Sequence, residues 1–174
     1  MKESERRKYM VYSKAVSIDS VGRRVRFFDM TEHVKNAVEE SGIKDGILVA
    51  YSQHTSCSIF LQEDSEDITY WGTPLILQDM LNIFDKYVPV CTAEGQYLHP
   101  GKIHTENAEK LRNEESAWLL NTDAHLRSVL LGRSESIPII NGELVLGEFG
   151  CVYFADFDQT RDRKRIFRIQ IIGE

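Results

Sequence analysis

The pattern of apolar and polar residues predicts strands and one helix over the first quarter of the chain. Residues 9–18 and 23–28 are rich in β-branched and aromatic side chains, and a Ser-Val-Gly turn sequence separates them, so they predict two strands. The sequence Asp-Met-Thr-Glu at 29–32 has the form of a capping box, and apolar residues recur after it at helical spacing. We therefore predict a helix that begins at this box and ends at Gly42.

Two apolar runs and an amphipathic segment follow. Residues 46–51 and 58–61 are mainly apolar and predict two buried strands. The segment 64–70, which begins with acidic residues, predicts a turn or a short helix. Apolar residues between 75 and 84 are spaced three and four apart, which predicts an amphipathic helix that starts near Pro74.

The second half of the chain is irregular at first and then rich in strands. Residues 85–120 predict a long loop that contains a short, solvated helix, and 121–132 predict a compact helix ended by glycine. The remaining predicted strands are 136–140, 143–146, 152–157 and 165–172, the first two joined by an Asn-Gly hairpin turn. Strands on both sides of a helical region, without regular βαβ alternation, predict an α+β fold.

Composition and charge narrow the class of protein. A chain of 174 residues fits one domain, and we assign that domain to 9–174 after an N-terminal tail at 1–8. The net charge of −6 argues against a nucleic-acid-binding protein, which more often presents a basic face. No apolar run approaches the roughly 20 residues that span a bilayer, so we expect no membrane partner.

The first residues and the cysteines indicate a cytoplasmic protein. The first eight residues are charged, and the apolar stretch of a signal peptide does not follow them. Cys57, Cys91 and Cys151 are odd in number, widely spaced and without a CxxC pair, which argues against a disulfide framework or a zinc ribbon. We expect reduced thiols in the cytoplasm.

Three histidines occupy positions from which they can converge. His54 opens a run of small polar residues between two predicted strands, His99 lies in the irregular region, and His125 lies one turn into the predicted helix. Each has an ordinary alternative: a core histidine, a solvated loop residue and a boundary residue of a helix. Together, three imidazoles can hold a divalent ion or act as general acids and bases. His104 is an alternative to His99, although its neighbours suggest an exposed helix start.

Charged residues give further candidates. Glu63 ends the strand that follows His54, a position from which it could orient an imidazole. Arg127 and Arg133 could hold a phosphate group, with surface solubility as the alternative. The basic segment 159–165 is interpreted as a solvated hairpin, with phosphate steering the less favoured reading. A Gly-rich phosphate-binding loop is not found in the sequence.

These motifs, in this order, resemble those of the YjbQ-like family. The His-Thr-Ser sequence at 54–56, with Glu63 after it, is similar to the family's HTS/T…NE block. Tyr-Leu-His at 97–99 is similar to its Y-x-H element, and Asp-Ala-His-Leu-Arg-Ser at 123–128 to its AHL(R/K) block. The likeness spans about residues 10–174. It implies an α+β domain with a largely antiparallel or mixed β-sheet core, sandwich-like or half-barrel-like, three to four helices, and assembly as a homotrimer.

The resemblance also implies a function. Family members are described as secondary thiamine-phosphate synthases, which join a pyrimidine pyrophosphate to a thiazole phosphate and release pyrophosphate. The implied active site, which is also the implied metal site, consists of His54, His99 and His125, with Glu63 and Arg127 as further catalytic candidates. The expected ligands are a small phosphorylated metabolite and a divalent ion, Zn²⁺ or Mg²⁺, without an organic cofactor.

The sequence departs from the family motifs in two places. Gly-Glu-Phe-Gly-Cys at 147–151 stands where the family has G-T-W-Q-G, and the loop at 100–120 is longer than the usual connection. If these segments shape the pocket, the substrate differs from the family norm. Two other functions stay open: a metal-dependent hydrolase of a small phosphorylated metabolite, and a non-catalytic oligomer whose histidines bind an anion.

Overall fold

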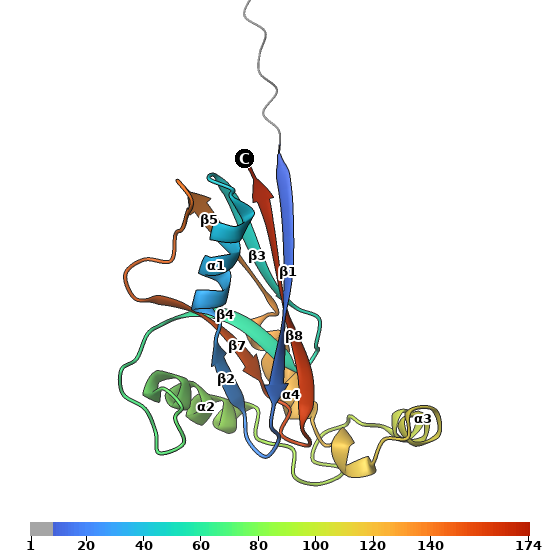
Figure 1. Ribbon diagram of the computed structural model, residues 1–174. Helices are drawn as coiled ribbons and strands as arrows, with labels where there is room; N and C mark the ends of the chain where they lie inside the picture. The colour runs from blue at the N-terminus through green and yellow to red at the C-terminus, as the bar shows by residue number, and fades with distance from the viewer. Residues whose placement is uncertain (1–8) are drawn as a thin grey trace, which may run out of the picture.

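The computed structural model describes residues 9–174, and Figure 1 shows the arrangement of their helices and strands. The strands are β1 (Met10–Ser20), β2 (Arg26–Asp29), β3 (Gly46–Ser52), β4 (Cys57–Glu63), β5 (Ser134–Ile140), β6 (Glu143–Leu144), β7 (Gly150–Asp156) and β8 (Arg163–Gly173). The helices are α1 (Thr31–Ser41), α2 (Leu75–Tyr87), α3 (Lys102–Arg112), the 3₁₀ helix η1 (Ser116–Leu119) and α4 (Thr122–Leu131). The predicted tail at 1–8 lies outside the described residues.

The strands form two antiparallel sheets. The larger sheet has the order β1-β8-β3-β5-β6, and the smaller sheet has the order β2-β7-β4. β1 and β8, at opposite ends of the described chain, pair from Met10 with Gly173 to Ser20 with Arg163. Helices and antiparallel sheets thus belong to one α+β architecture, which confirms the predicted fold class.

The smaller sheet is covered on both faces. Ile59 and Phe154 belong to a core that also contains residues of the larger sheet and of α1. Phe60 and Tyr153, their neighbours in sequence, belong to a second core with residues of α2 and α4. Because successive side chains of a strand point to opposite faces, this double burial explains why β4 and β7 contain continuous apolar runs.

α1 begins and ends close to where the sequence predicts. The N–H of Thr31 donates to Oδ1 of Asp29 over 2.8 Å, and the helix is followed by Gly42 with φ of 67°, a left-handed conformation that favours glycine. Glu32 receives a hydrogen bond from Lys35 at 3.0 Å. The carboxylate of Glu32 therefore pairs with Lys35, one turn further along the helix. It does not accept the hydrogen bond from the start of the helix that a capping box would require.

The irregular region contains the predicted short helix. α3 projects away from the two sheets (Figure 1), with Ala108 as its buried residue. At 64–70 the chain forms a turn with an isolated bridge between Ile68 and Pro74 in place of a short helix. Within residues 9–174, no helix has the length and apolar character needed to cross a bilayer.

Candidate functional site

A cleft of about 380 Å³ lies where several loops and helix ends meet. The turn between β3 and β4, the loop before α3, the α3–η1 segment, the start of α4 and the turn between β7 and β8 all contribute to it. Its titratable side chains are His54, His99, His104, His125, Arg112, Arg163, Arg165, Glu114 and Asp158. Imidazole and guanidinium groups gathered in a cleft of this size are typical of a small-molecule site.

The turn that carries His54 is fixed by its own small polar residues. The N–H of Cys57 donates to the His54 carbonyl at 3.1 Å, and the N–H of Phe157 donates to the Ser56 carbonyl at 3.0 Å. Oγ of Ser56 accepts a hydrogen bond from Arg165 at 3.1 Å. The turn is therefore tied to β7 and β8, which explains a Ser-rich sequence at a junction without glycine or proline.

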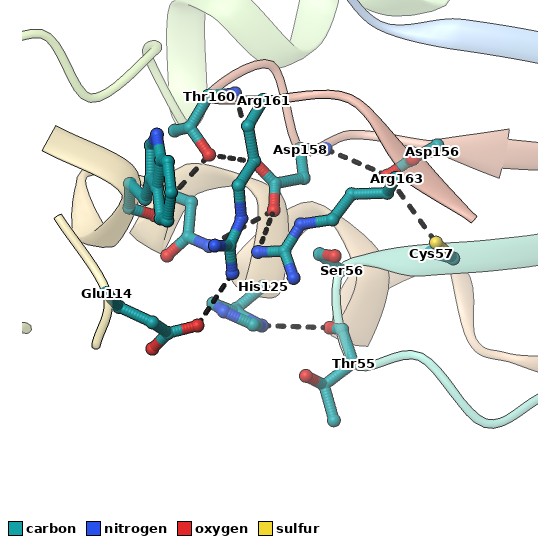
Figure 2. Close-up of polar contacts among 12 residues, drawn as sticks. Thr55, Ser56, Cys57, Glu114, His125, Asp156, Asp158, Thr160, Arg161 and Arg163 are labelled. Carbon is teal, nitrogen blue, oxygen red and sulfur yellow. Dashed lines mark hydrogen bonds and ion pairs between the residues drawn. The ribbon is translucent and has the colours of Figure 1, made fainter. Parts of the chain in front are cut away.

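Hydrogen bonds assign the tautomers of two histidines. Nδ1 of His125 lies 3.1 Å from the Thr55 carbonyl, which can only accept, so Nδ1 carries the proton (Figure 2). Oγ1 of Thr122 donates to the His99 carbonyl at 2.7 Å, and it therefore accepts from Nδ1 of His99 at 2.9 Å. In both rings Nε2 is left as the basic nitrogen.

His54 is held differently from the other two predicted metal ligands. Its Nε2 accepts a hydrogen bond from the backbone N–H of Ile166 at 2.9 Å, so the lone pair of that nitrogen is already used. Burial, together with the charge of Arg165, lowers the pKa of His54 and favours the neutral ring. The assignment of His54 as a metal ligand is therefore corrected. Among residues 9–174, no three or more His, Cys, Asp or Glu side chains are arranged to hold a metal ion.

His104 joins the cluster in place of His54. The ring centroids of His99 and His104 are 4.8 Å apart, and those of His99 and His125 are 6.1 Å apart. Burial lowers the pKa of His99, and positive charge on the other two rings lowers it further. The structure thus places the rings of His99, His125 and the exposed His104 of α3 near one another.

A buried ion pair forms one wall of the cleft. Arg165 donates hydrogen bonds of 2.7 Å to both carboxylate oxygens of Asp156, and the two side chains are only 5% and 1% exposed. Burial by itself would lower the pKa of Arg165, but the hydrogen bonds and the charge of Asp156 outweigh it and raise the pKa. Asp156 also accepts the backbone N–H of Asp158 at 3.1 Å.

Two more arginines, Arg161 and Arg163, precede Arg165 in the chain, and Figure 2 shows them near His125. Arg163 donates to Asp158 at 3.2 Å, Arg161 donates to Glu114 at 2.6 Å, and the Arg161 guanidinium lies 4.2 Å from the centre of the Trp118 ring. Burial lowers the pKa of Arg163. The interpretation of 159–165 as a solvated hairpin is therefore wrong. Arg163 and Arg165, two positions apart at the start of β8, share one face of the strand, and this spacing was the available signal.

Two predicted site residues lie elsewhere. Glu63 is exposed at the far end of β4, about 20 Å of extended strand from Cys57, and it does not line the cleft. It cannot orient one of these imidazoles, which corrects that prediction. Arg127 is buried, donates to Asp85 at 2.7 Å and lines a different cavity.

The two segments that depart from the family motifs, 100–120 and 147–151, line different cavities. The long segment 100–120 supplies His104, Arg112 and Trp118 to the cleft. The segment 147–151, which includes Gly150, lines a separate cavity beside α1. The segment 100–120 therefore shapes the histidine cleft, whereas the Gly-Glu-Phe-Gly-Cys sequence at 147–151 does not line it.

Comparison with known proteins finds relatives over most of the chain. A family model described as "UPF0047 protein YjbQ-like" matches residues 15–174. The chain is 31% identical to a UPF0047 protein of Methanothermobacter thermautotrophicus, with 94% of each chain covered. It is 29% identical to the UPF0047 protein YugU of Bacillus subtilis, with 81% of this chain and 86% of that protein covered.

Solved structures give the same result. A protein of the yjbq/upf0047 family from Clostridium acetobutylicum, described as uncharacterized, is 30% identical, with a TM-score of 0.64 over 89% of this chain and 97% of that chain. A YbjQ-like protein of unknown function from Sulfolobus solfataricus is 22% identical, with a TM-score of 0.71 over 96% of this chain and 100% of that chain. At this lower identity the second match supports the fold alone.

Replacing Arg165 by methionine is expected to destabilise the fold by about 3–5 kcal/mol, because it leaves Asp156 as an unpaired buried charge. Arg168→Met on the same strand is the control, since Arg168 is exposed and its Nε donates to Gln53 at 2.8 Å. Its free energy of unfolding should stay within about 0.5 kcal/mol of the wild type. Urea unfolding measures both variants. Equal losses in the two would contradict the assigned role of the ion pair.

The lowered pKa of His54 predicts a pH dependence of stability. An unfolded histidine titrates near pH 6.5, so the unfolded chain takes up this proton at a higher pH than the folded chain. The contribution of His54 to stability is therefore complete above about pH 6.5 and is lost as the pH falls through the window below it. His54→Gln keeps an acceptor for Ile166 but does not titrate, and it should lose less stability between pH 7.5 and 5.5 than the wild type. The exposed variant His33→Gln should behave like the wild type; a His54→Gln curve parallel to both would refute the assignment.

Proposed function

The chain belongs to the YjbQ-like family, UPF0047, and from this premise we propose that it is an enzyme that acts on a small phosphorylated metabolite in the histidine cleft. The observation that carries the proposal is the presence of His99 and His125, each with Nε2 left basic, in the same cleft as Arg163 and Arg112. Bases that can move a proton thus stand next to cations that can hold an anion.

The charge distribution supports an anionic substrate. The chain has a net charge of −6, yet arginines are concentrated around this cleft. Arg163 donates one hydrogen bond, to Asp158, while its Nε is a buried atom without a partner among residues 9–174. Arg112 uses Nε to bind Glu114 and keeps a half-exposed guanidinium. Both groups have N–H donors left for phosphate oxygens.

The histidines supply acid–base chemistry. His99 holds its Nδ1 proton against Thr122, and its lowered pKa keeps the ring neutral near pH 7, as a general base requires. His125 is oriented in the same way by the Thr55 carbonyl. Protonation of either ring at Nε2 would then allow the same nitrogen to return the proton to a leaving group.

The family resemblance supplies one specific candidate reaction, the coupling of a pyrimidine pyrophosphate to a thiazole phosphate. In this reaction a bond forms between the pyrimidine's methylene carbon and the thiazole nitrogen, while the bond from that carbon to the pyrophosphate oxygen breaks. Pyrophosphate leaves with the electron pair, and the arginines of the cleft would stabilise the charge that develops on it. Zn²⁺ or Mg²⁺ would offer similar stabilisation, but because His54 does not fit as a ligand no step is assigned to a metal.

Activity assays separate these alternatives. Purified protein is expected to turn over one of two probes: the pyrimidine pyrophosphate and thiazole phosphate pair, or a panel of phosphomonoesters. For the phosphomonoesters, whose hydrolysis requires the attacking water to lose a proton, His99→Gln should lower kcat/KM by about 100-fold or more, the usual contribution of a general acid–base group, with His33→Gln as the exposed control. The acidic limb of the pH profile should lie below pH 6.5, since burial lowers the pKa of His99.

The outcomes of this assay distinguish the proposed enzyme from its rivals. Turnover that persists in EDTA and is lost in His99→Gln agrees with acid–base catalysis. Turnover that requires added Zn²⁺ or Mg²⁺ would favour the metal-dependent hydrolase. Saturable binding of the probes without any turnover would favour the non-catalytic anion-binding oligomer.

We also propose the homotrimer that the resemblance implies, with the outer face of the larger sheet as the contact surface. Val11 pairs with Ile172, Ile172 with Ile47, and Ile47 with Pro138, so these residues form one apolar row across four strands. Val11, Ile47 and Ile172 are 64%, 52% and 47% exposed in a single chain. A continuous apolar row on an open sheet face supports burial against another copy.

Size-exclusion chromatography with multi-angle light scattering should give the mass of three chains for the wild-type protein. Ile47→Asp should shift the mass toward one chain, because it places a charge in the apolar row. Ile83→Asp makes the same change at an exposed position of α2 and should leave the mass unchanged. A wild-type protein that runs as a monomer would contradict the proposed assembly.

A further inference from the structure

A second cavity, of about 290 Å³, lies on the other side of α4 from the histidine cleft. Arg127 lines it, whereas His125 lines the histidine cleft. Side chains two positions apart on an α-helix differ by about 200° in direction around the helix axis. The side chains of His125 and Arg127 therefore leave opposite sides of α4. The other polar residues that matter in this cavity are Arg23, Arg24 and Asp85.

Arg127 is a buried charge with capacity left for a ligand. Its side chain is 1% exposed, and Nε and Nη2 donate to the Val88 carbonyl at 3.2 and 2.7 Å. Nη2 also donates to Asp85 at 2.7 Å. The third nitrogen, Nη1, makes none of these bonds. Within residues 9–174, the buried side-chain nitrogens that lack a partner are those of other residues. The guanidinium is thus held rigidly on the lining of the cavity, and the N–H groups of Nη1 are left as donors for a ligand.

Two more guanidinium groups line the same cavity. Arg24 lies 4.0 Å from the centre of the Trp71 ring, a cation–π contact that restricts its side chain before any ligand binds. Arg23 adopts φ of 82°, and its N–H donates to the Gln159 carbonyl at 2.8 Å, which fixes the turn that presents both arginines. With Asp85 as the carboxylate on the lining, the three arginines leave the cavity with an excess of positive charge.

We propose that this cavity is a second anion site, which binds the phosphate group of a small phosphorylated molecule. A phosphate monoester carries nearly two negative charges at pH 7, which matches the excess of guanidinium over carboxylate better than a single carboxylate does. The volume is at the lower end of the range for small-ligand sites. The site does not depend on the proposed enzyme function, because it shares no lining residue with the histidine cleft.

The two tryptophans of the chain allow each cavity to be followed separately. Trp71 lines the arginine cavity and Trp118 lines the histidine cleft. In a Trp118→Phe protein, intrinsic fluorescence reports on the arginine cavity alone. In a Trp71→Phe protein, tryptophan fluorescence comes from Trp118 and no longer reports on the arginine cavity. Failure of one site is therefore distinguishable from failure of the other.

The test is a titration of the Trp118→Phe protein with inorganic phosphate at constant ionic strength. Trp71 emission is expected to change and to saturate, while the same concentrations of chloride have no effect. Adding Arg23→Gln, which leaves the Arg24–Trp71 contact in place, should weaken the apparent phosphate affinity by about tenfold or more, as expected for the loss of one charged hydrogen bond. Lys110→Gln on α3 makes the same change of charge at an exposed position and should not alter the affinity.

Three results would overturn the proposal. One is an unsaturated or absent Trp71 response to phosphate, and another is an equal response to chloride. The third is equal weakening by Arg23→Gln and Lys110→Gln, which would indicate attraction to net charge without a defined site. A response of Trp118 in the Trp71→Phe protein bears only on the histidine cleft.

Discussion

Arg165 and Asp156 form the buried ion pair on which the walls of the histidine cleft depend. Arg165 also donates to Ser56, so it links β8 to the turn that carries His54. Asp156 accepts the N–H of Asp158, and the carboxylate of Asp158 in turn receives hydrogen bonds from Arg163 and other neighbours. Burying two charges is costly unless both are fully hydrogen-bonded. Here the further hydrogen bonds of Arg165 and Asp156 go to Ser56 and to the Asp158 N–H, and they hold the cleft's loops in place.

α4 couples this cleft to the rest of the molecule. His125 holds the carbonyl of the turn between β3 and β4, while Arg127 holds the C-terminal end of α2 through Val88 and Asp85. Both residues lie on α4, two positions apart, and their side chains leave opposite sides of the helix. α4 is therefore a wall of both cavities and is anchored to a different part of the molecule on each side.

Periodicity predicted the fold well because it reflects which faces are buried. The apolar runs of β4 and β7, the start of α1 after Asp29 and the glycine after the helix all follow from local spacing and local chemistry. The ring centroids of His99 and His125, which come from different parts of the chain, lie 6.1 Å apart. In contrast, the lone pair of His54 is used by Ile166, more than 100 positions away, and no local pattern reveals such a partner.

Charged residues were predicted less well, for a physical reason. A basic segment between strands is usually solvated, and only pairing with Asp156 and Asp158 allows Arg163 and Arg165 to turn inward. Strand alternation at 163 and 165 was a usable signal. Glu63 and Arg127 were assigned to the histidine cleft but lie outside it. Glu63 lies at the far end of β4, and Arg127 leaves α4 on the side that lines the second cavity. The length of a strand and the side of a helix that faces a cleft are set by the tertiary fold.

Long-range ¹H–¹⁵N correlation spectra of the histidine side chains test the central claim most directly, namely that the cleft holds oriented imidazoles beside an anion site. Near pH 7, His99 should be neutral with the proton on Nδ1, His125 should also carry a proton on Nδ1, and the Nε2 signals of both rings should shift and saturate on addition of inorganic phosphate. Protons on Nε2 of these rings, or Nε2 signals indifferent to phosphate, would contradict the account.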